Sequence, residues 1–332
     1  MVGRRTNLAL LVALVVAMGT GVATFAVGTA AGRAVVVVHG MAGFAVVLLA
    51  PWKQQIVRRR LRRPRRARRA GLALLGLVAI TVVAGIAHAA GVTPPAGVTA
   101  MQLHVGAALL MIVPAAWHVA TRPVRPRPVD LARRTTVRAG ALTVAAGVAW
   151  LAADGLYTLR GAPRRRFTGS HERGTDAPGR MPVTQWLSDA VPAIDPAAWS
   201  VTVDVPASAR SLSLRDLRAL PTARRRAVLD CTGGWYAVQT WSGVPLSVLI
   251  AGDAGRRVVV TSHTGYARAF PLEAVGDLLL ALDVAGAPLS AGHGAPVRLV
   301  APGRRGFWWV KWVTGVSVDD VPPWVQPPFP VQ

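Results

Sequence analysis

The stretch RRAVLDCTGGWYAVQTWSGVPLSVLI, residues 225–250, decides the fold of the C-terminal half and contains the only cysteine of the chain. Residues 226–230 form a short, mainly apolar run, which predicts a strand that ends at Cys231. A Thr-Gly-Gly turn follows, and glycines let the backbone approach a bulky group closely. We therefore expect a strand to deliver the cysteine to a tight turn beside a binding site.

Residue chemistry alone leaves three roles open for Cys231. The thiol could be a small buried hydrophobe, a nucleophile served by a base such as His263 or His293, or a ligand for a soft metal. Because it is the only cysteine, an intramolecular disulfide is excluded. Trp235 and Trp241 are expected to wall the site.

The rest of the C-terminal half mixes strand-like and helix-like segments. Ser213 followed by Asp216 is typical of a helix N-terminus, and Pro271 suits the first turn of another helix. Strands outnumber helices, which favours an α+β domain over residues 181–332, after a polar linker at 160–180. The predicted strands are 200–205, 225–230, 256–262, 296–301 and 308–318, and the predicted helices are 213–219, 245–251 and 271–282.

The N-terminal half, residues 1–159, has the character of a membrane domain. The chain is 52% hydrophobic with a mean hydropathy of +0.40 and a net charge of +23, and this half holds 19 of the 38 basic residues but two of the 15 acidic ones. A bilayer core of about 30 Å needs about 20 helical residues. Five apolar runs are long enough to serve as spans: 8–29, 34–51, 71–91, 101–120 and 138–158.

The basic residues between the spans predict the orientation. Segment 52–70 contains ten Lys and Arg and segment 121–138 contains six, whereas segment 91–100 has no charge. Cytoplasmic loops carry the excess of basic residues, so the N-terminus is expected in the cytoplasm and residues 160–332 outside it. The same rule explains the charge without nucleic acid, for which no motif is present. A cleaved signal peptide is the alternative for the first span.

Four histidines lie in or at the ends of the spans, where ionisable side chains are costly and often functional. His39 and His104 are expected near the outer face and suggest ligands for a haem b, with His88 as an alternative ligand. His118 follows His104 on the same helix face, about 21 Å further along, an arrangement that resembles di-haem b-type cytochromes. The alternative interpretation is that these histidines lie at the membrane interface and form hydrogen bonds with their neighbours.

Five blocks of the C-terminal half resemble the sulfite-oxidase family of molybdopterin-dependent oxidoreductases. CTGGWYAVQTWSGVPLSVLI is similar to the family's cysteine segment, and SLSLRDLRAL (211–220) and VVVTSHTGYARAFPLEAV (258–275) resemble the segments around it. APLSAGHGAPVRLVAP (287–302) and FWWVKWVTGVSV (307–318) resemble its late cofactor-binding segments. The implied architecture is a five-span α-helical transmembrane bundle followed by an α+β domain of the sulfite-oxidase molybdopterin-binding type.

The resemblance also implies roles for individual residues. Cys231 would bind molybdenum, and Tyr266 and Trp235 are pocket candidates. The Thr-Gly-Gly-Trp run after the cysteine departs from the arginine-containing run of sulfite oxidases, which puts sulfite as substrate in doubt; the size of the domain is closer to bacterial catalytic subunits that reduce oxidised methionine. The residues implied to hold the molybdopterin are His293, Arg298, Trp309, Val310 and Lys311.

The expected function is two-electron oxygen-atom transfer outside the cytoplasm, on a small molecule or an oxidised protein. Electrons would pass through the membrane half, from haem or directly from quinone or another carrier. A loaded domain would cross the membrane folded, and Arg133-Arg134 or Arg4-Arg5 could act as a twin-arginine signal, with positive-inside charge as the alternative. Two other readings are a cofactor-free binding or sensory module and an extracytoplasmic cysteine hydrolase.

Overall fold

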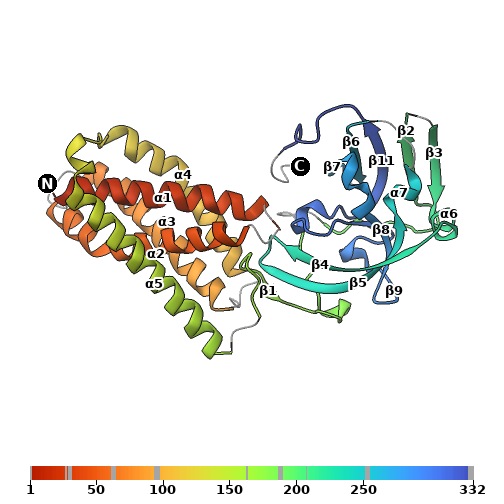
Figure 1. The fold of residues 1–332 in the computed structure, drawn as a ribbon, viewed down its shortest axis with the longest axis horizontal. Coiled ribbons are helices and arrows are strands. Elements are labelled where there is room, and N and C mark those ends of the chain that lie inside the picture. The colour runs from red at the N-terminus through yellow and green to blue at the C-terminus, as the bar shows by residue number, and fades with distance from the viewer. Residues whose placement is uncertain are drawn as a thin grey trace. The chain divides into compact units, whose positions relative to one another are not determined.

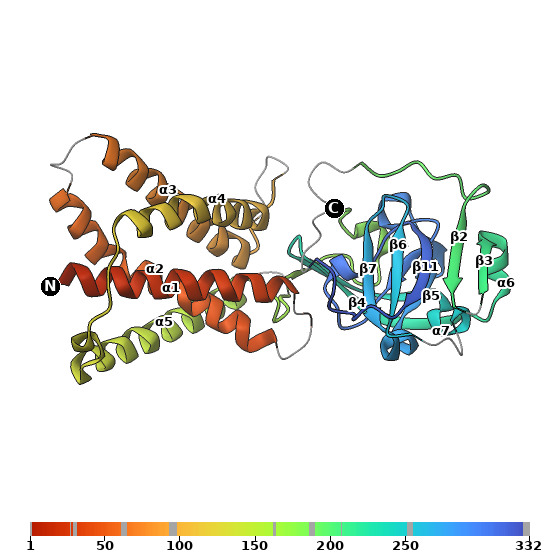
Figure 2. The same ribbon diagram turned by 90° about the horizontal axis from the view of Figure 1, so that it is seen from above.

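The computed structural model describes residues 2–26, 28, 32–60, 65–92, 98–161, 164–185, 190–206, 208–250 and 255–327. These residues form two compact units, one made of Met1–Phe25 and Ala30–Gly169 and the other of Ala26–Thr29 and Ser170–Gln332. Figures 1 and 2 show helices in the first unit and mainly strands in the second.

The first unit contains the five long apolar helices that the sequence predicts as spans. In Figure 2, α3 runs beside α4, and these two helices contact each other along their length. Many of their large apolar side chains face outward; Val113 is 77% exposed and Leu110 is 70% exposed. Exposed apolar surface on this scale suits a lipid environment. The helices are α1 (Val2–Ala26), α2 (Gly32–Arg60), α3 (Arg65–Ala89), α4 (Ala100–Thr121) and α5 (Arg133–Leu159).

The helices extend further than the predicted spans on the basic side. Helix α2 continues through Pro51 to Arg60, and α3 already begins at Arg65, so most of the basic segment expected as a loop at 52–70 is helical. Arginine and lysine are good helix formers, and a helix can continue beyond the apolar core of a bilayer. Residues 61–64 of that segment lie outside the described residues.

An ion pair fixes the N-terminal end of α1. Both guanidinium nitrogens Nη1 and Nη2 of Arg4 donate to the carboxylate of Asp130, at 2.6 and 2.7 Å. Asp130 belongs to η1 (Pro128–Leu131), the short helix between α4 and α5. The start of α1 and the basic 121–138 segment therefore lie at the same end of the helical unit, as the predicted topology requires.

The second unit contains two sheets that share one buried apolar cluster. The first sheet has the order β1-β5-β8-β10, with β4 paired to β5 and β9 to β8, and the second has the order β3-β2-β11-β6-β7. Alternating burial along β2, with Val201 and Val203 fully buried, shows one face of the second sheet turned to the core. The strands are β1 (His171–Glu172), β2 (Ser200–Val205), β3 (Ser208–Ser213), β4 (Ala223–Cys231), β5 (Trp235–Pro245), β6 (Arg257–Ser262), β7 (Ala267–Pro271), β8 (Leu279–Val284), β9 (Ala287–Pro288), β10 (Arg298–Val300) and β11 (Val313–Asp319).

Helices in this unit are short. Helix α6 (Leu214–Ala219) begins as predicted, with the Ser213 hydroxyl accepting from the Asp216 amide in a capping box. Helix α7 (Leu246–Leu249) lies within the predicted 245–251, whose last residue falls outside the described residues. The remaining turns are η2 (Pro178–Arg180), η3 (Leu272–Asp277), η4 (Ala291–His293) and η5 (Gly306–Trp308).

The predicted helix at 271–282 is wrong. A 3-10 turn, η3, is followed by strand β8, which lies between β5 and β10 in the first sheet. Leu278–Leu282 are all at most 3% exposed, so the run is apolar on both faces. A short, fully buried strand and a buried helix cannot be separated by periodicity, and the position inside the sheet decides for the strand.

Of the stretch expected as a linker at 160–180, residues 170–180 belong to the second unit, and the residues up to Gly169 belong to the first. Strand β1 pairs parallel to the start of β5, with His171 opposite Trp235. Ser170 and His171 are buried. The chain therefore enters the second unit immediately beside the turn that carries Cys231.

Candidate functional site

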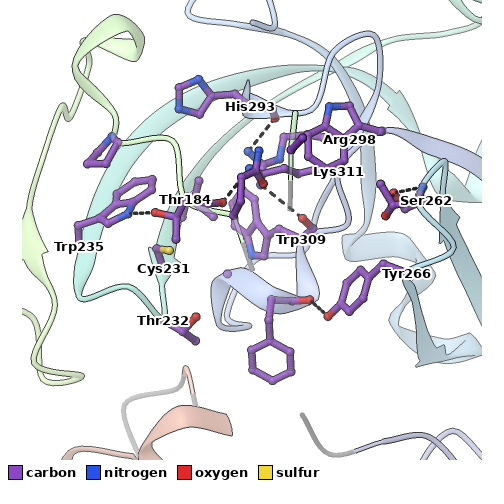
Figure 3. Close-up of a pocket in the computed structure, with 18 residues that line it drawn as sticks. Thr184, Cys231, Thr232, Trp235, Ser262, Tyr266, His293, Arg298, Trp309 and Lys311 are labelled. Carbon is purple, nitrogen blue, oxygen red and sulfur yellow. Dashed lines mark hydrogen bonds between the residues drawn. The ribbon is translucent and has the colours of Figure 1, made fainter. Parts of the chain in front are cut away.

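A cavity of about 350 Å³ opens beside the hairpin formed by β4 and β5, and Figure 3 shows the side chains that line it. Cys231 is the last residue of β4 and pairs with Trp235, the first residue of β5. Gly234 has φ +88°, a left-handed conformation that favours glycine. The predicted strand, cysteine and glycine turn are thus confirmed, and the thiol faces the cavity.

The local backbone contacts the sulfur of Cys231 directly. The Gly233 amide donates a hydrogen bond to Sγ at 3.3 Å. A Cβ at Gly233 would lie 3.3 Å from the Thr184 side chain and 3.5 Å from Sγ. The turn therefore brings a backbone donor to the sulfur without placing a side chain over it.

A buried ion pair lies next to the cysteine at the end of β4. Arg305 Nη1 donates to the Asp230 carboxylate at 2.6 Å, and both side chains are less than 5% exposed. The Ser170 hydroxyl donates to the same carboxylate oxygen at 2.7 Å, and Arg305 Nη2 lies 3.4 Å from the Cys231 carbonyl. A Cβ at Gly306 would lie 3.0 Å from Cys231 Cα. The 305–306 backbone is therefore packed directly against the cysteine.

Three basic side chains surround the cavity. Arg298 is 2% exposed, and burial lowers its pKa to about 10, against the opposing effect of Cys231. Burial, and next Arg298, lower the pKa of Lys311 to about 7. Burial, with contributions from Arg298 and Lys311, lowers the pKa of His293 to about 4. No carboxylate lines the cavity among the described residues, so the cavity suits an anion.

The basic groups differ in how many hydrogen bonds they still offer. Lys311 Nζ donates to three protein acceptors: the Gly292 and Thr184 carbonyls and Gln185 Oε1. Its three donors are therefore used, and it acts on the cavity mainly through its charge. Arg298 Nε and His293 Nε2, in contrast, are buried atoms without a partner within the described residues. Such atoms are costly unless a ligand satisfies them.

Aromatic side chains form the remaining walls. Trp235 Nε1 donates to the Thr184 hydroxyl at 2.9 Å, which fixes the indole next to the cysteine turn (Figure 3). The Tyr266 hydroxyl donates to the Phe307 carbonyl and accepts from Arg268 Nε at 2.6 Å. Burial raises the pKa of Tyr266, and Arg268 partly offsets this rise. The phenol is therefore held in place as a neutral group.

The structure brings nearly all the predicted residues of this half into one place. Val310 is an exception, because its side chain is buried in the apolar core and is not among the described residues that line the cavity. Trp241 is also core, in contact with Trp309 and Arg298. His263 is exposed and lines no part of the described cavity. The predicted residues that do line it are Cys231, Trp235, Tyr266, His293, Arg298, Trp309 and Lys311.

Other lining residues carried no recognisable signal in the sequence. Thr184 and Gln185 precede β2 in an irregular segment, and nothing in their spacing connects them to the cysteine. Arg305 does not line the cavity but contacts the cysteine strand from the other side; it lies two residues before the FWWVKW motif, where its charge resembles that of an ordinary loop arginine. The other lining residues missed are Pro182, Ala190, Leu229, Thr232, Ser262, Thr264, Gly306, Phe307 and Trp312.

In the helical unit, two of the four predicted histidines lie together. The rings of His39 and His104 have centroids 5.8 Å apart, at an interplanar angle of 86°. His88 Nε2 lies 3.0 Å from the Gly169 carbonyl, away from this pair. His118 lies near the opposite end of α4. Figure 1 shows α2 and α4 as members of the same bundle.

Comparison with known proteins defines the class of the second unit. Residues 188–324 match the family model described as the oxidoreductase molybdopterin binding domain. The C-terminal unit therefore contains a molybdopterin-binding oxidoreductase domain, the domain of molybdenum-dependent oxidoreductases.

Several individual proteins are similar to this part of the chain. The chain is 28% identical over 165 residues to the mitochondrial sulfite oxidase of Drosophila melanogaster, covering 39% of this chain and 29% of that protein. It is 30% identical over 187 residues to the protein-methionine-sulfoxide reductase catalytic subunit MsrP of Xanthomonas campestris pv. campestris, covering 47% and 54%. It is 29% identical over 167 residues to the uncharacterized oxidoreductase YuiH of Bacillus subtilis (strain 168), covering 44% and 82%. The chain thus spans less than a third of the sulfite oxidase it matches.

Proposed function

We propose that the chain is a membrane-anchored, molybdenum-dependent oxidoreductase that transfers an oxygen atom to or from a small molecule or an oxidised protein. One observation carries the proposal: the only thiol of the chain faces a cavity that is ringed by basic groups and contains no described carboxylate. A soft thiolate is the side chain expected to bind a redox metal such as molybdenum. The surrounding charge suits the anionic cofactor that carries this metal.

The residues present fit molybdopterin. Cys231 would supply a thiolate to the metal, whose binding keeps the sulfur deprotonated, and the Gly233 amide would help to orient it. Arg298 Nε and His293 Nε2 need partners, and phosphate or pterin heteroatoms would satisfy them. Lys311 would add charge while its donors hold the 184–185 and 292 backbone in place. The Trp309 side chain would form part of the wall.

When bound, the cofactor would supply two-electron oxygen-atom transfer with water as the source or product of the oxygen. The protein would position it and control what reaches it. The indole of Trp235 and the phenol of Tyr266 are fixed by hydrogen bonds, so they would define the opening without large movement. Their aromatic surface and the Thr184 hydroxyl would favour a sulfur-containing organic group over a small multiply charged anion. This selectivity agrees with the lack of an arginine in the turn after Cys231.

The helical unit would anchor the enzyme in the membrane. Its outward-facing apolar side chains and its basic end support five spans with the N-terminus in the cytoplasm. The C-terminal unit would then lie outside the cytoplasm. Electrons would enter or leave through the helical unit, by way of haem or directly from quinone. Export of a loaded domain by a signal at Arg133-Arg134 remains part of this proposal.

Activity assays on the purified full-length protein test the proposed reaction. We expect reduction of a methionine sulfoxide or a related sulfoxide with a reduced viologen dye, and loss of this activity in Cys231→Ala. Thr222→Ala, at an exposed position just before β4 and away from the cavity, is the control and should keep it. Molybdenum-loaded protein that oxidises sulfite rapidly and does not reduce sulfoxides would overturn the substrate class. A Cys231→Ala variant with full activity would overturn the site.

A further inference from the structure

We infer that the helical unit binds one haem b between His39 of α2 and His104 of α4, and that His88 and His118 are not ligands. The pair is the point from which the inference starts: their rings are 5.8 Å apart, at 86°. With metal–imidazole bonds of about 2.0 Å, two imidazoles on opposite sides of one metal have ring centroids about 6 Å apart. The helices therefore already hold the rings near the separation that such a metal requires.

Both imidazoles are oriented by a hydrogen bond to a backbone carbonyl of a neighbouring helix. His39 Nδ1 lies 2.9 Å from the carbonyl of Ala17 in α1, and His104 Nδ1 lies 2.7 Å from the carbonyl of Thr81 in α3. Because a carbonyl only accepts hydrogen bonds, each Nδ1 must carry the proton. Each Nε2 then has a free lone pair, as in histidines that ligate metals through Nε2.

A glycine one turn after each carbonyl makes room for the ring. A Cβ at Gly21 would lie 3.2 Å from Cε1 of His39, and a Cβ at Gly85 would lie 2.8 Å from Nδ1 of His104. A side chain at position 85 would therefore force the His104 ring to move, and one at position 21 would press tightly against the His39 ring. The same carbonyl-and-glycine arrangement thus occurs on two helix pairs, and the two histidines that it orients lie next to each other.

Two histidines are too few to hold a bare metal ion, so the metal must bring its other ligands with it. Within the described residues no cluster of three or more His, Cys, Asp or Glu side chains could hold a bare ion. Two imidazoles leave the other coordination positions of a metal to be filled by the ligand itself, and a haem fills four of them. Open space at Gly43, one turn after His39, and the apolar surroundings suit a flat, apolar macrocycle.

The position of the pair fits an electron relay, and this use rests on the proposed function. His39 and His104 lie near the N-terminal ends of α2 and α4, the end of the bundle at which α5 finishes and the chain continues to the redox unit. The iron would change between ferric and ferrous, one electron at a time. A two-electron turnover at molybdenum would therefore use the haem twice, with quinol or quinone as the partner that supplies or takes two electrons and two protons.

Absorption spectra and haem content of the full-length protein in detergent test the inference. We expect one haem b per chain, with spectra typical of two histidine ligands, and at least a tenfold loss of haem in His39→Ala and His104→Ala. His88→Ala and His118→Ala should keep the full content. Adding imidazole to His104→Gly should restore the spectrum, which separates lost ligation from misfolding.

The glycines provide matched controls for the orienting device. Gly21→Ala and Gly85→Ala should weaken haem binding by about 10- to 100-fold, the usual effect of disturbing groups that orient a ligand. Gly19→Ala and Gly76→Ala lie on the same two helices with open space around them and should have no effect. Two haems per chain, full haem in His104→Ala, or no haem after hemin is added to the wild type would overturn the inference. Molybdenum measured on the same preparation separates this failure from failure of the proposed function.

Discussion

Replacing Arg305 by methionine should destabilise the C-terminal unit strongly. The Asp230 carboxylate is 2% exposed, and Arg305 is the cation paired with it at 2.6 Å. Removing one member of a buried ion pair costs about 3–5 kcal/mol, because the other charge is left without its partner. A domain of this size loses about 2–4 °C of melting temperature per kcal/mol, so the expected decrease is about 6–20 °C.

Tryptophan fluorescence during thermal unfolding of the full-length protein in detergent measures this decrease. Arg226→Met is the matched control. Arg226 forms a bidentate ion pair with Asp176 that is equally short, but this pair lies on the surface. The surface pair should change the melting temperature little. The double variant Asp230→Asn with Arg305→Met should recover most of the loss, since no charge is then left buried. A decrease no larger than that of Arg226→Met would refute the reasoning.

Two further outcomes follow from the site and the core. Lys311 has a pKa of about 7 in the fold and a higher one when unfolded, so the unfolded chain binds more protons between pH 7 and about 10. Unfolding of the cofactor-free protein should therefore show stability rising across this range, and Lys311→Met should remove the rise; an unchanged pH profile would contradict the assigned burial. Gly243→Ala should cost about 1–3 kcal/mol, because its Cβ would lie 2.0 Å from the Leu280 carbonyl, whereas Gly276→Ala, with open space, should not. Urea titration of the two glycine variants measures this difference. Equal unfolding midpoints for Gly243→Ala and Gly276→Ala would contradict the close packing of β5 on β8.

Local patterns in the sequence were enough to predict much of the fold. Five apolar runs predicted five helices, and the Ser213–Asp216 cap predicted the start of α6. The strand ending at Cys231 followed from its composition and the glycines after it. The helix at 271–282 failed because β8 is apolar on both faces, a property set by its neighbours in the sheet rather than by its own residues.

The candidate site was likewise predictable only in part from the sequence. Cys231, Arg298 and Lys311 could be named because the resemblance covers their segments. Thr184 and Arg305 reach the cysteine only through tertiary contacts, across about 47 and 74 positions of chain. The pairing of His39 with His104, rather than with His88, likewise depends on how the helices pack, which spacing along one helix does not determine.

The direct test of the central claim is the sulfur coordination of molybdenum in the purified full-length protein. X-ray absorption at the molybdenum edge should show three sulfur ligands in the wild type, two from the cofactor and one from Cys231. Cys231→Ser should keep the cofactor and show two. Molybdenum with the same sulfur count in both proteins, or wild-type protein without molybdenum, would contradict the account.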